Sequence, residues 1–291
     1  MRALVLGGAS WNRMLHLPEL PGDRPRTIFA SGTHEAIGSS GAPKALNLAR
    51  LGWETTLLAP LGADAAGESV RAGLAEAGVS LLEVHDPGGT MQHVNLMAPG
   101  GERISIFANP GTLDVELDHH TYVEQALGAD LVAVSIFEYC RGFLSPLREA
   151  GIEIWIDVHD YDGANPYHGD FVDAAGVLQV STVALPDWRA FAEARVAAGA
   201  RAVVCTHGAQ GASVVTEAGW VEIEPEPVPE LVDANGAVDP FFAGFATAWV
   251  TGTEPAAAGR RGAIAAAAAL GSPELASREP PESWERIDGA G

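Results

Sequence analysis

Residues 233–245 read Asp233-Ala234-Asn235-Gly236-Ala237-Val238-Asp239-Pro240-Phe241-Phe242-Ala243-Gly244-Phe245, a polar turn that runs directly into an apolar segment. Asn235-Gly236 is a typical turn pair, and Pro240 suits the first position of a helix because its missing N–H would have no partner there anyway. The pattern therefore predicts a helix whose N-terminus lies at or just after Asp239.

A helix N-terminus preceded by a glycine turn is a site for an anion. The free N–H groups of Gly236, Ala237 and Val238 would point toward a phosphate, and the positive end of the helix dipole would add to the attraction. The carboxylate of Asp239 could accept a proton from an attacking hydroxyl in the same place. Alternatively, Asp239 is an ordinary N-cap residue with no chemical role.

Outside this turn, short apolar runs rich in Val, Ile and Leu alternate with Ala-rich segments. This alternation indicates βαβ units, a mainly parallel sheet covered by helices on both faces, and a ligand crevice at the carboxyl ends of the strands. The predicted strands are Ala3–Leu6, Thr55–Ala59, Asp130–Ser135, Glu153–Asp157, Ala202–Thr206 and Ala212–Val215, and the predicted helices are Ala45–Leu51, Ala65–Ala77, Gly142–Ala150, Asp187–Ala198 and Ala256–Leu270.

Two regions interrupt the alternation. Thr27–Ser31 and a hairpin of His93–Ala98 and Glu102–Phe107 have the pattern of strands without crossover helices. They predict a small β lid over the crevice, with lid strands around residues 26–32 and 91–108. Alternatively, they are edge strands of the main sheet.

Composition limits the class of protein. A chain of 291 residues with 47% hydrophobic residues predicts one globular domain spanning residues 1–291, with residues 272–291 as a loosely packed tail. With 38 Asp and Glu against 17 Lys and Arg, its surface would repel a nucleic acid.

The location expected from the sequence is cytoplasmic. The apolar run Ala3–Leu6 is too short for a signal peptide or a membrane span, which argues against a membrane partner. Cys140 and Cys205 have neither the spacing of a thiolate metal site nor that of a disulfide framework.

Two segments resemble the signatures of the ribokinase-like (PfkB) carbohydrate kinase family. Residues 233–241 are similar to its second signature, D-T-x-G-A-G-D-x-F. Residues 38–52 are similar to its first signature, G-G-x-G-A-N-x-A-x-x-x-A-x-L-G, with matching spacing. Weaker resemblances cover residues 5–12 (the opening strand and turn), 100–103 (the lid hairpin) and 203–212 (the nucleotide-binding strand and loop).

The resemblance implies a fold and an activity. The fold would be a ribokinase-like three-layer α/β/α arrangement with a mainly parallel central sheet and a small β lid. The activity would be ATP-dependent phosphorylation of a hydroxyl of a sugar, nucleoside or related small polyol. In the family the turn matching Gly236–Asp239 forms an anion hole, and the Asp matching Asp239 is the general base.

The resemblance also implies further site residues and partners. Asp187 aligns with a residue that organises Mg²⁺, although it alternatively reads as a helix N-cap. ATP and Mg²⁺ are the expected cofactors; a monovalent cation near the anion hole and a homodimer through the lid are further expectations. The substrate would be bound by Asn12, Ser39, Ser40 and Gly41, and the nucleotide by Thr206, Gly208 and Gly211.

Three positions depart from the family pattern. Val238 replaces a Gly of the anion hole, and its branched side chain disfavours positive φ. Pro43 replaces an Asn, and Asn12 replaces an acidic residue. These departures indicate an alternative function, that of a degenerate family member that binds or senses a small molecule. A dinucleotide-dependent oxidoreductase would need G-x-G-x-x-G after the first strand, which Gly7-Gly8-Ala9-Ser10 does not supply.

Overall fold

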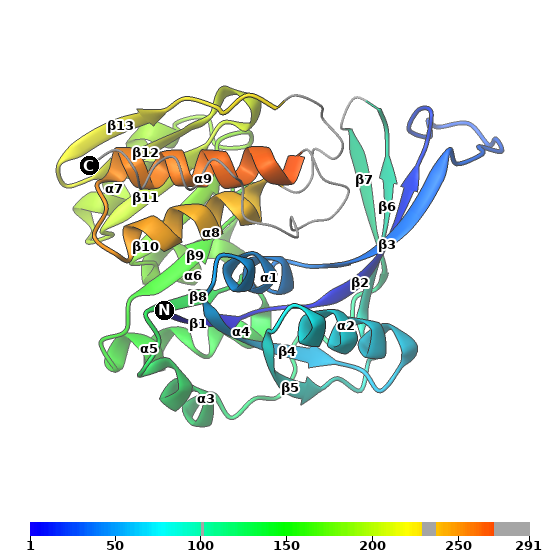
Figure 1. Cartoon of the computed structure of the whole chain (residues 1–291), viewed down its shortest axis with the longest axis horizontal. Helices are drawn as coiled ribbons and strands as arrows, with labels where there is room; N and C mark the ends of the chain where they lie inside the picture. The colour runs from blue at the N-terminus through cyan, green and yellow to red at the C-terminus, as the bar shows by residue number, and fades with distance from the viewer. Residues whose placement is uncertain (100–101, 229–236, 271–291) are drawn as a thin grey trace.

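A nine-stranded sheet forms the centre of the molecule, and a four-stranded sheet stands beside it at one end (Figure 1). The computed structural model describes residues 1–99, 102–228 and 237–270. The central strands lie in the order β13-β12-β11-β10-β9-β8-β1-β4-β5, and all neighbours are parallel except for the pairs β11–β12 and β12–β13.

The elements follow the predicted alternation of strands and helices. The central strands are β1 (Arg2–Leu6), β4 (Glu54–Leu61), β5 (Ser80–His85), β8 (Leu131–Val134), β9 (Ile154–Asp157), β10 (Val177–Ser181), β11 (Ala202–Thr206), β12 (Ala212–Thr216) and β13 (Gly219–Ile223). The helices are α1 (Ala42–Arg50), α2 (Ala65–Glu76), α3 (His119–Ala126), α4 (Glu138–Arg141), α5 (Leu144–Glu149), α6 (Gly169–Ala174), α7 (Trp188–Ala197), α8 (Val238–Trp249) and α9 (Pro255–Leu270), with short 3₁₀ turns η1 (Pro166–His168) and η2 (Gly208–Gln210).

Helices cover both faces of the central sheet. Successive side chains of a strand point to opposite faces, so Ala3 and Val5 of β1 join one hydrophobic cluster and Leu4 and Leu6 join another. The first cluster includes residues of α1, α2, α8 and α9, and the second includes residues of α3, α5, α6 and α7. The three-layer α/β/α fold predicted from the sequence is therefore confirmed.

The four-stranded sheet confirms the predicted lid and excludes the alternative of extra edge strands on the central sheet. Its strands β2 (Ser10–His16), β3 (Gly32–Gly38), β6 (Met91–Met97) and β7 (Arg103–Asn109) lie in the order β3-β2-β6-β7. The first strand, β2, follows β1 closely in sequence and carries the chain from the central sheet into the lid (Figure 1). A homodimer formed through this lid stays a prediction.

One predicted lid strand is wrong. Thr27–Ser31 is not a strand, because the pairing of β2 with β3 ends where His16 lies opposite Gly32. Residues before Gly32 therefore have no partner strand, and the side chain of Phe29 is 85% exposed in consequence. The apolar composition of this segment was a misleading strand signal.

The predicted C-terminal tail at residues 272–291 lies outside the described residues. Across residues 1–99, 102–228 and 237–270, no helix is both long enough and apolar enough to span a membrane.

Candidate active site

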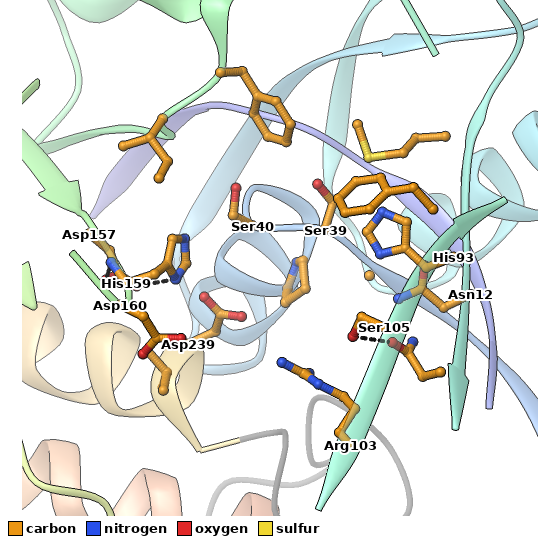
Figure 2. A pocket seen from close by; sticks show the side chains of 18 of the residues that line it. Asn12, Ser39, Ser40, His93, Arg103, Ser105, Asp157, His159, Asp160 and Asp239 are labelled. Carbon is orange, nitrogen blue, oxygen red and sulfur yellow. Dashed lines mark hydrogen bonds and ion pairs between the residues drawn. The ribbon is translucent and has the colours of Figure 1, made fainter. Parts of the chain in front are cut away.

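A cavity of about 480 Å³ lies between the carboxyl edge of the central sheet and the lid (Figure 2). Its volume lies in the range of about 300–1,000 Å³ that is typical of small-molecule sites. The lid contributes Asn12, Met14, Gly38, Met91, His93, Asn95, Arg103, Ser105 and Phe107, the start of α1 contributes Ser39, Ser40 and Pro43, and the central sheet and α8 contribute Ile136, Phe137, Asp157, His159, Asp160, Ser181, Val238 and Asp239.

The N-terminus of α1 packs against the chain just after β1. The backbone N–H groups of Gly41 and Ala42 donate to the carbonyl oxygen of Gly8, at 3.1 and 2.9 Å. A Cβ atom on Gly41 would lie 2.8 Å from the backbone carbon of Gly7. Gly41 therefore allows close packing of two backbones and does not line the cavity, whereas the predicted substrate residues Ser39 and Ser40 do.

Asp239 lies in the first turn of α8, which begins one residue earlier, at Val238. Its side chain is 22% exposed and lines the cavity. Val238 is helical, so its branched side chain is not forced into a positive φ. Ala237 precedes the helix with φ −82°, and the predicted anion-hole residue Gly236 lies outside the described residues.

A buried lysine joins Asp239 to a second carboxylate. The Nζ of Lys44 lies 2.6 Å from Oδ1 of Asp239 and 3.1 Å from Oδ2 of Asp157. Burial acts to lower the pKa of Lys44, but the attraction of the two carboxylates outweighs it and raises that pKa above its ordinary value. Burial acts to raise the pKa of Asp157, but His159 and Lys44 hold it below its ordinary value.

Strained backbone marks the cavity wall. Among the described residues, the only non-glycine residues with positive φ are Ser39, at 76°, and His159, at 51°. Both line the cavity, and such strain concentrates at functional sites. The N–H of His159 donates to Oδ1 of Asp157 at 2.9 Å, which ties the strained turn to the end of β9.

On the lid side, the predicted substrate residue Asn12 is held inside β2. Its side-chain oxygen accepts a hydrogen bond from the hydroxyl of Ser10 at 2.7 Å. A Cβ atom on Gly38 would overlap the side-chain amide of Asn12, which explains why glycine suits this position of the first signature.

The hairpin of β6 and β7 contributes side chains that the sequence analysis did not identify. His93 packs on Phe107 with ring centroids 4.1 Å apart, and Ser105 donates to Asn95 at 2.7 Å. Burial, and then the charge of Arg103, lower the pKa of His93, so its imidazole is neutral at neutral pH. Alternating polar residues along both strands were the signal that could have revealed this face.

The predicted nucleotide residues form a hairpin loop at the same edge of the sheet. Thr206 ends β11, opposite the cavity residue Ser181, and η2 follows it before the antiparallel strand β12. A Cβ atom on Gly208 would meet nothing within 4 Å, so the backbone is accessible there, whereas a Cβ atom on Gly211 would overlap the carbonyl oxygen of Ile223. Thr206, Gly208 and Gly211 do not line the cavity, and their contact with ATP stays a prediction.

Asp187 directly precedes α7, at the position of a helix N-cap, although its side chain makes no capping hydrogen bond. It does not line the cavity. Within the described residues, no group of three or more His, Cys, Asp or Glu side chains could hold a metal ion. Mg²⁺ in kinases commonly needs only one or two protein carboxylates beside the phosphates, so Asp187 stays a prediction for this role.

Comparison with known proteins agrees with this architecture. The model of the pfkB family of carbohydrate kinases matches residues 23–188 and 168–281. The acarbose 7(IV)-phosphotransferase of an Actinoplanes species is 32% identical over 280 residues, which cover 93% of this chain and 92% of that protein.

Solved structures give the same result. A microbiome-derived acarbose kinase superposes with a TM-score of 0.87 at 28% identity, covering 98% of each chain. Arabidopsis thaliana ribokinase, complexed with ribose and ATP, superposes with a TM-score of 0.78 at 20% identity, covering 100% of this chain and 99% of that one, and shows the fold. The chain therefore belongs to the PfkB family of carbohydrate kinases, phosphotransferases that use ATP and an alcohol acceptor.

Proposed function

We propose that this kinase transfers the γ-phosphoryl group of ATP to a hydroxyl of acarbose, or of a sugar that resembles it, with Asp239 as the general base. The position of Asp239 carries the proposal. Its partly exposed carboxylate faces the cavity from the first turn of a helix. A hydroxyl bound in the cavity would lie within reach of this carboxylate, and the helix N-terminus would attract the phosphoryl group.

The chemistry follows from these two features. The acceptor oxygen forms a bond to the γ-phosphorus while the bond from that phosphorus to the β,γ-bridging oxygen breaks, and its electron pair leaves with ADP. Asp239 takes the proton of the acceptor hydroxyl. The N–H groups of Ala237 and Val238, which have no acceptor within the helix, stabilise the charge on the transferring group. Gly236 is the third proposed donor.

Positioning carries most of the catalysis in phosphoryl transfer. We assign the nucleotide to the loop of Thr206, Gly208 and Gly211. Mg²⁺ bound to the phosphates supplies charge neutralisation when present, with Asp187 as the proposed protein carboxylate. A monovalent cation near the anion hole stays a prediction.

The cavity supports an acceptor of considerable size. It combines apolar and aromatic surface, including Phe107 and Phe137, with hydrogen-bonding groups such as Asn12 and Ser40. This mixture is typical of sites that fix a ligand by a few polar contacts. The lid and the central sheet both contribute residues to the cavity, so we propose that the chain functions as a single kinase domain. The names of two relatives supply the acceptor class.

The alternative of a degenerate binding protein loses part of its basis. It depended on Val238, Pro43 and Asn12, and Val238 occupies a helical position that a branched residue tolerates. Asn12 keeps a side-chain amide at the cavity wall. Lys44, the residue after Pro43, places its ammonium beside the carboxylates of Asp157 and Asp239. No observation favours the binding protein over the kinase.

Release of ADP from Mg-ATP tests the proposal, with acarbose, oligosaccharides, monosaccharides and nucleosides as acceptors. We expect turnover with acarbose or a similar sugar, and a fall in kcat of about 10²–10⁴-fold in Asp239→Asn. Asp173→Asn is the matched control, because Asp173 is 69% exposed on α6 and pairs with Arg195 on the surface. Undiminished turnover in Asp239→Asn would contradict the base assignment, and turnover with nucleosides alone would contradict the acceptor class.

A further inference from the structure

Lys44 is the only lysine in the sequence, where the other 16 of the 17 basic residues are arginines. It lies in the first turn of α1, and its side chain is only 4% exposed. A lysine is rarely buried unless it is paired. The one lysine of this chain therefore occupies a position where its ammonium needs charged or hydrogen-bonding partners.

The ammonium of Lys44 is fully engaged. It donates to Oδ1 of Asp239 at 2.6 Å, to Oδ2 of Asp157 at 3.1 Å and to the carbonyl oxygen of Ser40 at 3.3 Å. It also lies 5.4 Å from the centre of the Phe242 ring. The three acceptors belong to three different segments, and three donors on one compact ammonium match their number.

The contacts join segments that are far apart in sequence. Asp157 is 113 residues from Lys44 and ends β9, and Asp239 is 195 residues away in α8. Asp157 is itself held by the N–H of His159 at 2.9 Å and by the side-chain amide of Gln179 at 3.4 Å. The central sheet therefore provides a fixed anchor for Lys44.

The two carboxylates differ in their access to the cavity. The side chain of Asp157 is 2% exposed and that of Asp239 is 22% exposed. Lys44 does not line the cavity, so it lies behind the carboxylates and out of reach of the acceptor. One oxygen of Asp239 is engaged by the ammonium, which leaves the other oxygen for a hydroxyl.

We propose that Lys44 is a positioning residue that orients the carboxylate of Asp239 for proton transfer, with Asp157 as its anchor. This inference rests on the proposed function, because it takes Asp239 as the base. A further titratable side chain, His159, has its Nδ1 3.5 Å from Oδ2 of Asp157, and Asp160 and Arg103 line the same cavity.

A purely structural role for Lys44 is the competing explanation. Removing Lys44 alone would leave two neighbouring carboxylates without their cation, which is strongly destabilising whatever Lys44 does in catalysis. The double variant Lys44→Met with Asp157→Asn removes the ammonium together with the buried charge that it neutralises. Asp157→Asn alone is the matched control, because it retains both Lys44 and Asp239.

Steady-state kinetics at one pH compares kcat and KM of the two variants. We expect kcat of the double variant to be at least about tenfold below that of Asp157→Asn, with the KM for the sugar changed less than about threefold. Equal kcat in the two variants would overturn the proposal.

A spectroscopic measurement needs neither substrate nor a folded double variant. Growth on ¹⁵N-lysine labels one side-chain ammonium, so the spectrum contains a single lysine side-chain signal. We expect a slowly exchanging signal that moves in Asp239→Asn and stays in place in Asp173→Asn. A rapidly exchanging signal that stays unchanged in Asp239→Asn would contradict the ion pair between Lys44 and Asp239.

The measurements separate two kinds of failure. Undiminished sugar-dependent turnover in Asp239→Asn would refute Asp239 as the base whatever the lysine signal shows. A large fall in kcat in Asp239→Asn, together with a double variant that behaves like Asp157→Asn, would refute only the role of Lys44.

Discussion

The carboxyl edge of the central sheet and the lid face the same cavity but are built differently. At the sheet edge, Lys44 and Asp157 are buried and paired, and aromatic residues of α8 pack beneath them. The lid strand β7 is exposed over almost its whole length. The difference shows that one wall of the cavity is tied to the buried core while the other belongs to an exposed sheet, a division that suits the proposed positioning chemistry.

The strongest test of this comparison replaces one phenylalanine on each side. Phe245 of α8 is 1% exposed and packs on Trp155, with ring centroids 6.1 Å apart, whereas Phe29 of the lid connection is 85% exposed. We expect Phe245→Ala to lower the free energy of unfolding by about 3–5 kcal/mol, because it leaves a cavity in the core. Phe29→Ala should change it by less than about 0.5 kcal/mol. Urea unfolding measures both, and similar losses would contradict the contrast.

A smaller loss of stability is expected where α1 meets β1. The Cβ atom of Gly41→Ala would press on the backbone of Gly7, which cannot move aside like a side chain. We expect the free energy of unfolding to fall by about 1–3 kcal/mol. Gly169→Ala is the control, since a Cβ atom there meets nothing within 4 Å and its φ is −51°. An unchanged free energy of unfolding in Gly41→Ala would show that this junction is loosely packed.

On the lid, a substitution should affect substrate binding and leave stability almost unchanged. Phe107 lines the cavity, whereas its neighbour Ile106 does not, because successive residues of β7 point to opposite faces. We expect Phe107→Ala to raise the KM for the sugar about tenfold, with kcat nearly unchanged, and Ile106→Ala to leave both constants unchanged. A large fall in kcat for Phe107→Ala would place the lid in the chemical step.

The smallest predicted effect concerns pH. The pKa of His93 is below its ordinary value, because burial and Arg103 disfavour the charged imidazole. The stability that neutral His93 contributes is therefore present above about pH 6.5 and is lost as the pH falls through its lowered pKa. We expect wild type to lose less than about 1 kcal/mol more than His93→Gln over this range. Thermal unfolding at several pH values measures the difference, and parallel curves would contradict it.

Local patterns predicted much of the fold. Apolar runs and turn residues identified six of the nine central strands and the paired strands of the lid hairpin, because strand and helix periodicity depend on near neighbours. The central strands β5, β10 and β13 were not predicted. The prediction of a strand at Thr27–Ser31 was wrong, because a strand also needs a partner, and β2 ends at His16. The strand β3 (Gly32–Gly38) forms just after this segment, because β2 is the partner that determines where it begins.

The site divides in the same way. The sequence by itself determined that a helix begins beside Asp239 and that the turn pair Asn235-Gly236 precedes it in the chain, since caps and turns are local chemistry. Only the tertiary structure decided that Lys44, which reads as an ordinary helix residue, lies between Asp157 and Asp239. The physical reason is that burial and charge pairing depend on which distant segments the sheet brings together, and no local pattern in the sequence specifies those neighbours.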